Sequence, residues 1–134
     1  MALNPKTSAA SRNLALNAAY DVLNSGKFKG YDSTQPTDAD TALGSQVKLF
    51  ELAFASTAFA AASAGSKAAA SITQDSSADA AGTLAWATCT KSDDTRVLDM
   101  SAGTSGANLN MNSVAIASLA VVQITALTIT QAAG

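Results

Sequence analysis

The chain of 134 residues contains no histidine. Without histidine, Ser-His-Asp and Cys-His catalysis and the usual zinc and iron sites are excluded, and the commonest acid–base group at neutral pH is missing. The single cysteine, Cys89, excludes an intrachain disulfide. We expect Cys89 to be a small apolar residue on one face of a strand, with an interchain bridge as the alternative. The sequence therefore predicts no enzyme, no cofactor and no metal ion.

Charged side chains are also scarce, at 13% of the residues, and the formal net charge is −2. The eight basic residues are scattered, and the closest pair, Lys27 and Lys29, flanks Phe28 on what we expect to be one face of a strand. A nucleic-acid interface needs a denser basic patch, so we expect no direct contact with nucleic acid. Sparse charge together with many small residues suits a protein that packs against other chains in an assembly.

Carboxylates remain as groups that bear chemistry, and six of them come in close pairs. A calcium site made from two loops would use such oxygen ligands, but the chain has no EF-hand spacing. The favoured interpretation is that these aspartates stabilise turns. The pairs are Asp38/Asp40, Asp75/Asp79 and Asp93/Asp94.

Two further features have a structural interpretation and a functional alternative. Residues 103–106, Gly-Thr-Ser-Gly, resemble a phosphate-binding loop, but they lack its lysine and precede a strand pattern, so we interpret them as a turn. Trp86 is the only tryptophan, and its place in an alternating pattern predicts a core position. The alternative for Trp86 is a platform on which a sugar ring stacks.

Residues 114–130 are the segment that invites comparison with a membrane span. They are short for a span, have no flanking basic anchors and are interrupted by Ser118, Gln123 and three threonines. They are also rich in β-formers, so the pattern predicts a strand and no membrane contact. The first residues of the chain lack the apolar region of a secretory signal.

Alanine is abundant, at 31 residues, whereas only seven residues are aromatic. A core is possible with 48% hydrophobic residues, but alanine buries less area than Leu or Phe. Contacts with a partner would then add to the stability of the folded state. The length suits one domain, which we expect at residues 8–134 after an N-terminal arm at residues 1–7.

Residues 8–24 are predicted to form a helix, with Ser8 or Ser11 as the N-cap. Gly26 is expected to follow the helix as its C′ residue. The asparagines are expected mostly away from the apolar side. That side is expected to hold residues spaced at i, i+4 and i+7 with two alanines beside them, namely Leu16, Tyr20, Leu23, Ala9 and Ala19.

Alternating patterns predict about seven short strands after the helix. The first, around Phe28, is expected to be half-exposed, and the polar segment 91–95 is expected to join two strands into a hairpin. Leu98 and Met100 are expected to face inward. Six of the strands are predicted at residues 27–32, 46–55, 67–74, 83–90, 96–102 and within 114–130.

The last predicted strand has an irregular pattern. The apolar residues at 122 and 124 share one face, whereas those at 127 and 129 share a face of opposite parity. A β-bulge near residues 125–126 would bring all four to the core side. The alternative is a strand buried on both faces, with Val121 packed as well.

Short strands, frequent turns and a single helix predict a mainly β fold, an antiparallel β-sandwich of jelly-roll type with one N-terminal α-helix. Parallel βαβ units would need more helices. The row of Asn108, Asn110 and Asn112 has period two and is expected to lie on one face. We take these asparagines, together with Lys27 and Lys29, as candidate partner-contact residues.

Six segments form an ordered set: Asn13-Leu-Ala-Leu-Asn17, Gly26-Lys-Phe-Lys-Gly-Tyr-Asp-Ser-Thr-Gln-Pro36, Phe54 with Ala62-Ser-Ala-Gly65, Ile72-Thr-Gln-Asp-Ser-Ser-Ala-Asp-Ala-Ala-Gly-Thr83, Gly103-Thr-Ser-Gly-Ala-Asn-Leu-Asn-Met-Asn112 and Leu127-Thr-Ile-Thr130. The set covers nearly the whole chain and resembles a family of small tailed-bacteriophage virion proteins, similar to jelly-roll head decoration (cement) proteins. Ser118-Leu119 departs from this pattern, because related chains often have glycine there.

This resemblance implies a capsid decoration protein that reinforces the phage head, with the major capsid protein and further copies of itself, as a dimer or trimer, as partners. It implies a place on the capsid surface of the virion after synthesis in the host bacterial cytoplasm. Strand addition at a free sheet edge and docking of residues 1–7 are the expected modes of contact. The alternative is a tail- or fibre-associated β-sandwich module that binds host-surface carbohydrate, which requires Trp86 or Tyr31 to be exposed beside carboxylates.

Overall fold

The computed structural model describes residues 3–131, which form a mainly β structure with one short α-helix. Helix α1 spans Ala9–Tyr20 and continues into a 3-10 turn, η1, at Asp21–Leu23. Within the described range ten strands follow, and most of them are short. They are β1 Lys27–Tyr31, β2 Lys48–Phe54, β3 Ser66–Ala68, β4 Ile72–Thr73, β5 Gly82–Thr83, β6 Trp86–Thr90, β7 Arg96–Gly103, β8 Leu109–Asn110, β9 Ala115–Ile116 and β10 Thr128–Thr130.

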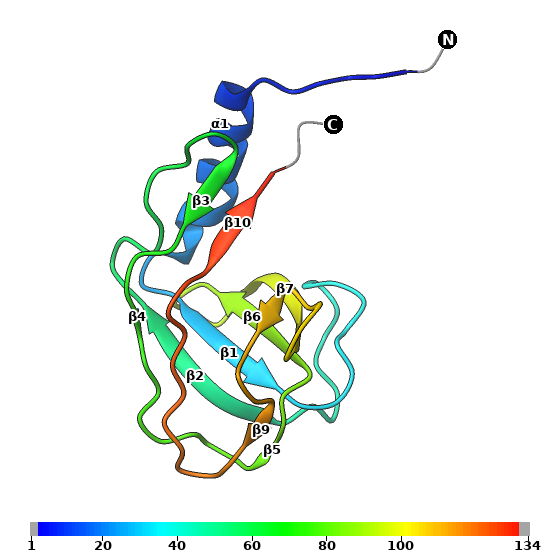
Figure 1. Cartoon of the computed structure of the whole chain (residues 1–134), viewed down its shortest axis with the longest axis vertical. Coiled ribbons are helices and arrows are strands. Elements are labelled where there is room, and N and C mark those ends of the chain that lie inside the picture. The colour runs from blue at the N-terminus through cyan, green and yellow to red at the C-terminus, as the bar shows by residue number, and fades with distance from the viewer. Residues whose placement is uncertain (1–2, 132–134) are drawn as a thin grey trace.

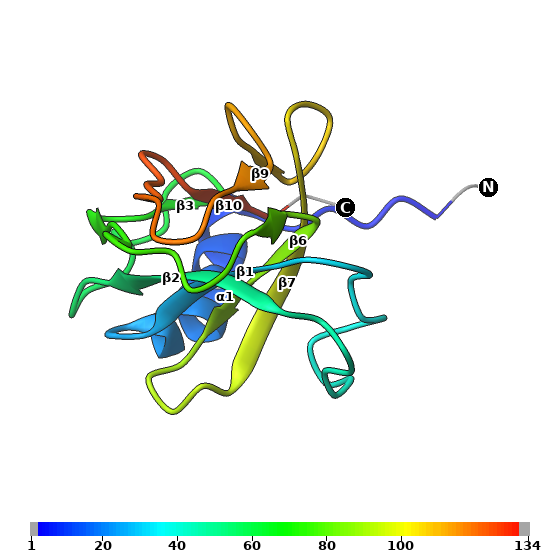
Figure 2. The same ribbon diagram turned by 90° about the horizontal axis from the view of Figure 1, so that it is seen from below.

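A curled six-stranded sheet in the order β4-β2-β1-β6-β7-β8 forms the body of the molecule (Figure 1, Figure 2). Its neighbouring strands are antiparallel except for β7 and β8, which are parallel. Strand β1 is central and pairs along its whole length with β2 on one edge and β6 on the other. Phe28 faces the core, and Lys29 on the other face is covered by Glu51 and Asp94, so β1 is buried rather than half-exposed and the expectation for this strand was wrong.

Two short ladders complete the pairing of the described strands, β3 with β10 and β5 with β9. The β3–β10 ladder stands beside α1 at one end of the molecule, and β5 and β9 lie at the opposite end (Figure 1). The mainly β class and the N-terminal helix are therefore confirmed. The arrangement of the strands as the two facing sheets of a jelly roll is not confirmed.

Most of the other strand predictions hold. The predicted strand at 67–74 is divided into β3 and β4, and the one at 83–90 is divided into β5 and β6. The turn at 91–95 joins β6 and β7 into the expected hairpin. Met100 is buried and Leu98 is half-buried against the core.

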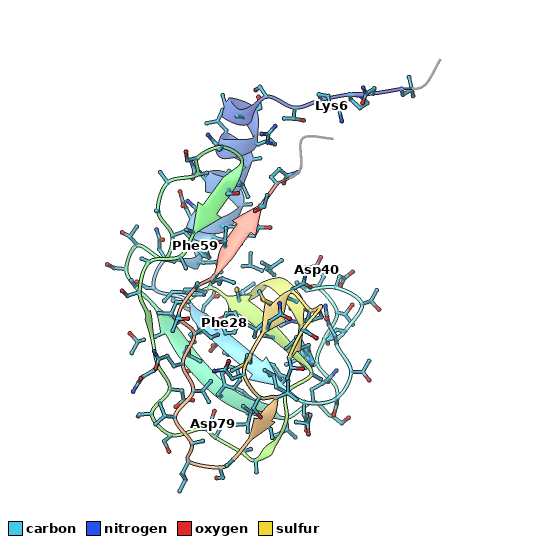
Figure 3. All side chains as sticks on the ribbon, in the orientation of Figure 1. Lys6, Phe28, Asp40, Phe59 and Asp79 are labelled. Atoms are coloured by element: carbon cyan, nitrogen blue, oxygen red, sulfur yellow. The ribbon has the colours of Figure 1, made fainter. Side chains whose placement is uncertain are left out.

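The hydrophobic core is built around the central strands. Phe28 of β1 meets Phe54 of β2 edge-on, with 6.4 Å between the ring centroids, and Phe54 lies 5.6 Å from Phe59. Figure 3 shows Phe28 in the body of the molecule and Phe59 close to the end of β3. Val122 and Ile124 from the last third of the chain pack into the same core. The core therefore joins the central sheet to the segment around Phe59 and to the segment that contains Val122 and Ile124.

The C-terminal apolar segment differs from the expected bulged strand. Within 114–130 the described strands are β9, Ala115–Ile116, and β10, Thr128–Thr130, while Val122 forms an isolated bridge with Asp75. The side chains at 122 and 124 are buried and those at 127 and 129 are half-buried, so all four face the core as expected. The change of alternation between residues 124 and 127 occurs in the irregular stretch 123–126, which is not paired as a strand, and not at a β-bulge. Val121 is 60% exposed, so the alternative of a strand buried on both faces was wrong.

Helix α1 begins at the expected residue. The hydroxyl of Ser8 accepts a hydrogen bond from the N–H of Ser11, which satisfies one of the free donors at the start of the helix. Leu16 and Leu23 are buried, as the i, i+4, i+7 spacing predicted. Ala9 and Ala19, which we expected on this side, are exposed.

The end of the helix differs from the expected glycine C′ arrangement. The residue with left-handed backbone geometry is Ser25, with φ of 58°. Gly26 is instead required for close approach, because a Cβ atom there would lie 2.1 Å from the carbonyl oxygen of Thr90. The absence of a side chain at Gly26 therefore allows the chain after η1 to pack closely against Thr90, at the end of β6.

Asparagine side chains attach the helix to the body, although we expected them mostly elsewhere. Their carboxamide oxygens accept hydrogen bonds from backbone N–H groups of the irregular segment 58–65. An apolar side chain would leave those donors without a partner, which explains why polar residues occupy this side of the helix. The bonds run from Gly65 to Asn13 (3.0 Å), from Ala62 to Asn17 (3.0 Å) and from Ala58 to Asn24 (2.9 Å).

A buried lysine strengthens the same attachment. Lys67 is 1% exposed, and its ammonium group donates to Asn17 at 2.8 Å and to the carbonyl of Ala60 at 3.0 Å. It also pairs with the carboxylate of Asp21 at 2.8 Å. A buried ammonium group needs such partners, because burying it unpaired would cost several kcal/mol.

We expect Asn17→Ala to lower the free energy of unfolding by roughly 1–3 kcal/mol, because two donors lose a shared acceptor. Equilibrium unfolding in urea, followed by the fluorescence of Trp86, measures this change. Asn4→Ala, on an exposed residue of the arm, is the matched control and should change the free energy by less than about 0.5 kcal/mol. Equal stability of the two variants would show that Asn17 does not anchor the helix.

Candidate interaction surface

A row of alternating charges crosses the sheet on the face opposite Phe28. The ammonium groups of Lys27 and Lys29 lie 2.8 Å and 2.7 Å from the same carboxylate oxygen of Asp94. Lys29 is also 3.7 Å from Glu51, its cross-strand neighbour. The two lysines therefore share one face, as expected, but their charges are paired within the chain. The row continues from Glu51 to Lys48 (3.1 Å) and from Lys48 to Asp79 (3.3 Å).

The turn between β6 and β7 holds Asp94 over the two lysines. Asp94 has a left-handed backbone, with φ of 70°, in the polar turn that the sequence predicted. Hydrogen bonds from Lys27 and Lys29 stabilise the charged form and lower the pKa of Asp94 to about 2. The same hydrogen bond from Lys27 to Asp94 raises the pKa of Lys27.

The asparagine row lies in and after β8. Asn108 and Asn110 are exposed on either side of the buried Leu109, as the alternation predicted. The side chain of Asn108 accepts from the hydroxyl of Ser101 at 3.0 Å, and that of Asn110 bonds to the backbone of Ala107. These two asparagines therefore stabilise their own loop.

Asn112 differs from the other two asparagines. It is exposed, and its side chain makes no hydrogen bond to another described residue. Asn110 and Asn112 both line an open hollow, which Asn108 does not. The structure therefore brings two of the three predicted asparagines to one site and leaves Lys27 and Lys29 elsewhere.

This hollow, which we name the β8 groove, has a volume of about 550 Å³. One wall is formed by β8 and the residues that follow it, and the other wall by the segment 120–126. Strand β8 is the last strand of the large sheet, so this edge is not covered by another strand of the sheet. None of the lining residues is charged. The lining comprises residues 109–113, 115–117 and 120–126.

The backbone of the second wall is largely unpaired. The N–H and C=O groups of residues 123–126 make no hydrogen bond to another described residue. A second hollow of about 380 Å³ lies along the same stretch, lined by 69–72 and 124–127. Val121, in the wall of the groove, is 60% exposed. The groove thus combines free backbone donors and acceptors with an exposed apolar side chain.

Trp86 is not available as a platform for sugar. It is fully buried and stacks on Tyr31, with 4.8 Å between ring centroids and 15° between the ring planes. Its indole N–H donates to the carbonyl of Asp32 at 3.1 Å, and the guanidinium of Arg96 lies 5.6 Å from the ring centroid. Tyr31 is only 7% exposed. The core position predicted for Trp86 is confirmed.

Cys89 is buried among the core residues of β6, which confirms the expectation of a small apolar residue on a strand. Burial raises the pKa of its thiol to about 12, so the thiol is protonated at neutral pH. An interchain bridge would require this side chain to leave the core.

Several aspartates have the turn-stabilising role that we favoured. Asp38 accepts from the N–H of Thr41 at 2.9 Å, and Asp93 from that of Thr95 at 3.0 Å. Within residues 3–131, no three His, Cys, Asp or Glu side chains gather in a way that would hold a metal ion. No helix in the described part of the chain is long and apolar enough to span a bilayer.

No protein-family model, curated protein or solved structure matches this chain. The β8 groove is therefore the candidate site on the strength of its own geometry. The sequence identified Asn110 and Asn112 as candidate contact residues, but the opposite wall of the groove was missed because we interpreted 114–130 as a strand. The signal was the parity change between 124 and 127, which marks the unpaired stretch.

We expect Asp94→Asn to reduce stability at neutral pH and to have a smaller effect in acid. The pKa of Asp94 is lowered to about 2, so its contribution is complete above the unfolded value of about 3.9 and is lost as the pH falls through about 2. Urea midpoints of both proteins between neutral pH and about pH 2 measure the change. Asp40→Asn, which removes a carboxylate without a described partner, should have little effect throughout. A difference between Asp94→Asn and the wild type that stays constant with pH would contradict this account.

Proposed function

We propose that this chain is a structural virion protein, a capsid decoration (cement) protein that binds the major capsid protein and reinforces the phage head. The resemblance of its turns and strand ends to small virion proteins supports the proposal. The structural observation that carries it is the β8 groove, an uncharged hollow with one wall of unpaired backbone. Such a surface suits a stable protein–protein contact better than a catalytic reaction.

The groove fits an extended segment of a capsid subunit. Strand addition supplies main-chain hydrogen bonds, which residues 123–126 can accept and donate. Val121 supplies apolar contact, and the free carboxamide of Asn112 supplies a polar contact beside it. Because the lining has no charge, binding through this groove should depend only weakly on salt concentration.

The N-terminal arm offers a second contact with the shell. Residues 3–7 are exposed and extend away from the body of the molecule (Figure 1, Figure 2). Leu3 is 96% exposed, and Figure 3 shows Lys6 on this arm away from the sheet. Met1 and Ala2, which complete the predicted arm, lie outside the described residues. An arm of this kind would order on a neighbouring subunit and add contact area.

The jelly-roll sandwich belongs to the same proposal. The curled sheet supplies one layer, and Ile116 of β9 packs with Val122 and Ile124 into the core beside it. The alternative function, binding of host-surface carbohydrate, needs an exposed Trp86 or Tyr31. Both side chains are buried, so no observation favours it.

Binding to heads that lack this protein tests the proposal. Purified protein is mixed with heads from a phage in which its gene is deleted, and bound protein is measured after sedimentation. We expect Val121→Lys to weaken binding at least about tenfold, because it places a charge in the uncharged groove. Val47→Lys is the matched control, since Val47 is also an exposed valine (47%) but lies outside the groove.

Two results would contradict different parts of the proposal. If the wild-type protein did not bind the heads, the decoration role would be wrong. If Val121→Lys bound as tightly as Val47→Lys and the wild type, the groove would not be the contact surface. Added wild-type protein should also raise the temperature at which the heads release their DNA.

A further inference from the structure

Lys67 is a buried nucleophile for which the head-binding role has no use. It lies in β3, beside helix α1 (Figure 1), and it is 1% exposed. Among the described lysines it is the most buried, and it alone donates a hydrogen bond to a side-chain carboxamide. By contrast, the ammonium groups of Lys27, Lys29 and Lys48 have carboxylates as their side-chain partners. A buried amine beside an amide is therefore particular to this place in the fold.

Three oxygen atoms surround the ammonium group of Lys67. The carboxamide oxygen of Asn17 and a carboxylate oxygen of Asp21 each lie 2.8 Å from Nζ, and the carbonyl oxygen of Ala60 lies 3.0 Å from it. Three acceptors match the three donors of the group and fix its position. The amine is thereby held between an amide and a carboxylate, which are an electrophile and an acid–base group for amide transfer.

The carboxamide of Asn17 is arranged for attack by an amine. Its carbon atom Cγ is one bond from the oxygen that Lys67 contacts, so a small side-chain rotation brings Nζ to the reacting distance of roughly 3–3.5 Å. The same oxygen accepts a hydrogen bond from the backbone N–H of Ala62 at 3.0 Å. This donor stabilises the negative charge that the oxygen gains when an amine adds to Cγ.

We propose that Lys67 and Asn17 form an isopeptide bond within the folded chain, with Asp21 as the acid–base group. The carboxylate of Asp21 accepts a proton from the ammonium group, and the free amine adds to Cγ of Asn17. The electron pair of the C=O bond moves to the oxygen. Asp21 then passes a proton from the attacking nitrogen to the carboxamide nitrogen, the bond between that nitrogen and Cγ breaks, and the C=O bond forms again.

The reaction needs no further reactant. One –NH3+ group and one –CONH2 group become an –NH–CO– link and one ammonium ion, so atoms and charge balance and nothing is oxidised or reduced. The side chain of Asp21 is 54% exposed, which gives the ammonium ion a way to solvent. All the groups belong to one chain, so the bond does not depend on the capsid role.

The link joins helix α1 to β3. Besides the packing of Leu16, polar contacts attach this helix to the body, and the helix carries the exposed arm at residues 3–7. A covalent bond between residues 17 and 67 keeps the helix in place when the arm is pulled. It also closes a long loop in the unfolded chain, as a disulfide does. The loss of stability that Asn17→Ala causes through its hydrogen bonds is then increased by the loss of the link.

The mass of the intact, denatured chain tests the bond. We expect the purified wild type to be lighter than the mass of its sequence by one ammonia. Trypsin should fail to cut after Lys67 and should release residues 13–27 joined to residues 49–91. Lys67→Arg and Asp21→Ala should each keep the full mass, because the first lacks the nucleophile and the second lacks the acid–base group. Circular dichroism checks that each variant is folded.

Asn13→Ala is the matched control. It removes the same kind of hydrogen bond between the helix and the segment 58–65, from the N–H of Gly65, but it leaves the three reacting side chains in place. This variant should lose one ammonia, as the wild type does.

A folded wild type that keeps its full mass after prolonged incubation at neutral pH would overturn the proposal. A loss of ammonia without the joined peptides would also overturn it, as would a loss of water with Lys67 joined to Asp21. A bond that still forms in Asp21→Ala would contradict the role given to Asp21. These results come from the isolated chain, so they are independent of whether it binds phage heads.

Discussion

The pairing of β1 along both of its edges is the constraint on which the rest of the structure depends. Five residues, Lys27–Tyr31, lie between β2 and β6, and the glycine within them keeps the neighbours close. A Cβ atom at Gly30 would lie 2.3 Å from the ring of Phe50. Because the strand alternates, the same pairing directs Phe28 into the core and Lys27 and Lys29 to Asp94 on the other face.

The outer parts of the molecule are held less tightly than this centre. The C-terminal third packs apolar side chains over the core, but the backbone of residues 123–126 makes no hydrogen bond within the described part of the chain. Helix α1 is fixed by polar bonds to an irregular segment, while Leu14 of the helix and Val22 of the following turn η1 are exposed. The periphery of the molecule therefore has backbone groups that are free to form hydrogen bonds in one place and exposed apolar side chains in another. A protein that works within an assembly would bury these surfaces on its neighbours.

Local patterns predicted much of this fold. The helix with Ser8 as its N-cap, the hairpin turn at 91–95 and the burial of Trp86 and Cys89 follow from short-range spacing. The central place of β1 and the pairing of Lys27 with Asp94 did not follow, because the partners are distant in the chain. The prediction for the asparagines of α1 was wrong for a similar reason. The backbone N–H groups that they bind belong to residues 58–65, which are distant in the chain.

The candidate site could be predicted only in part. Asn110 and Asn112 were identified from their period-two spacing, and they do line the groove. The facing wall was missed, because β-branched residues favour a strand even where the fold leaves the backbone unpaired. The jelly-roll expectation depended on counting strands, and the number of strands does not determine how they pair.

The copy number of the protein in purified virions tests the central claim most directly. Quantitative mass spectrometry of intact particles, and of heads separated from tails, measures it against the major capsid protein. The decoration role predicts an amount comparable with that of the major capsid protein, recovered with the heads. Absence from the particles, or recovery only with the tails, would contradict it.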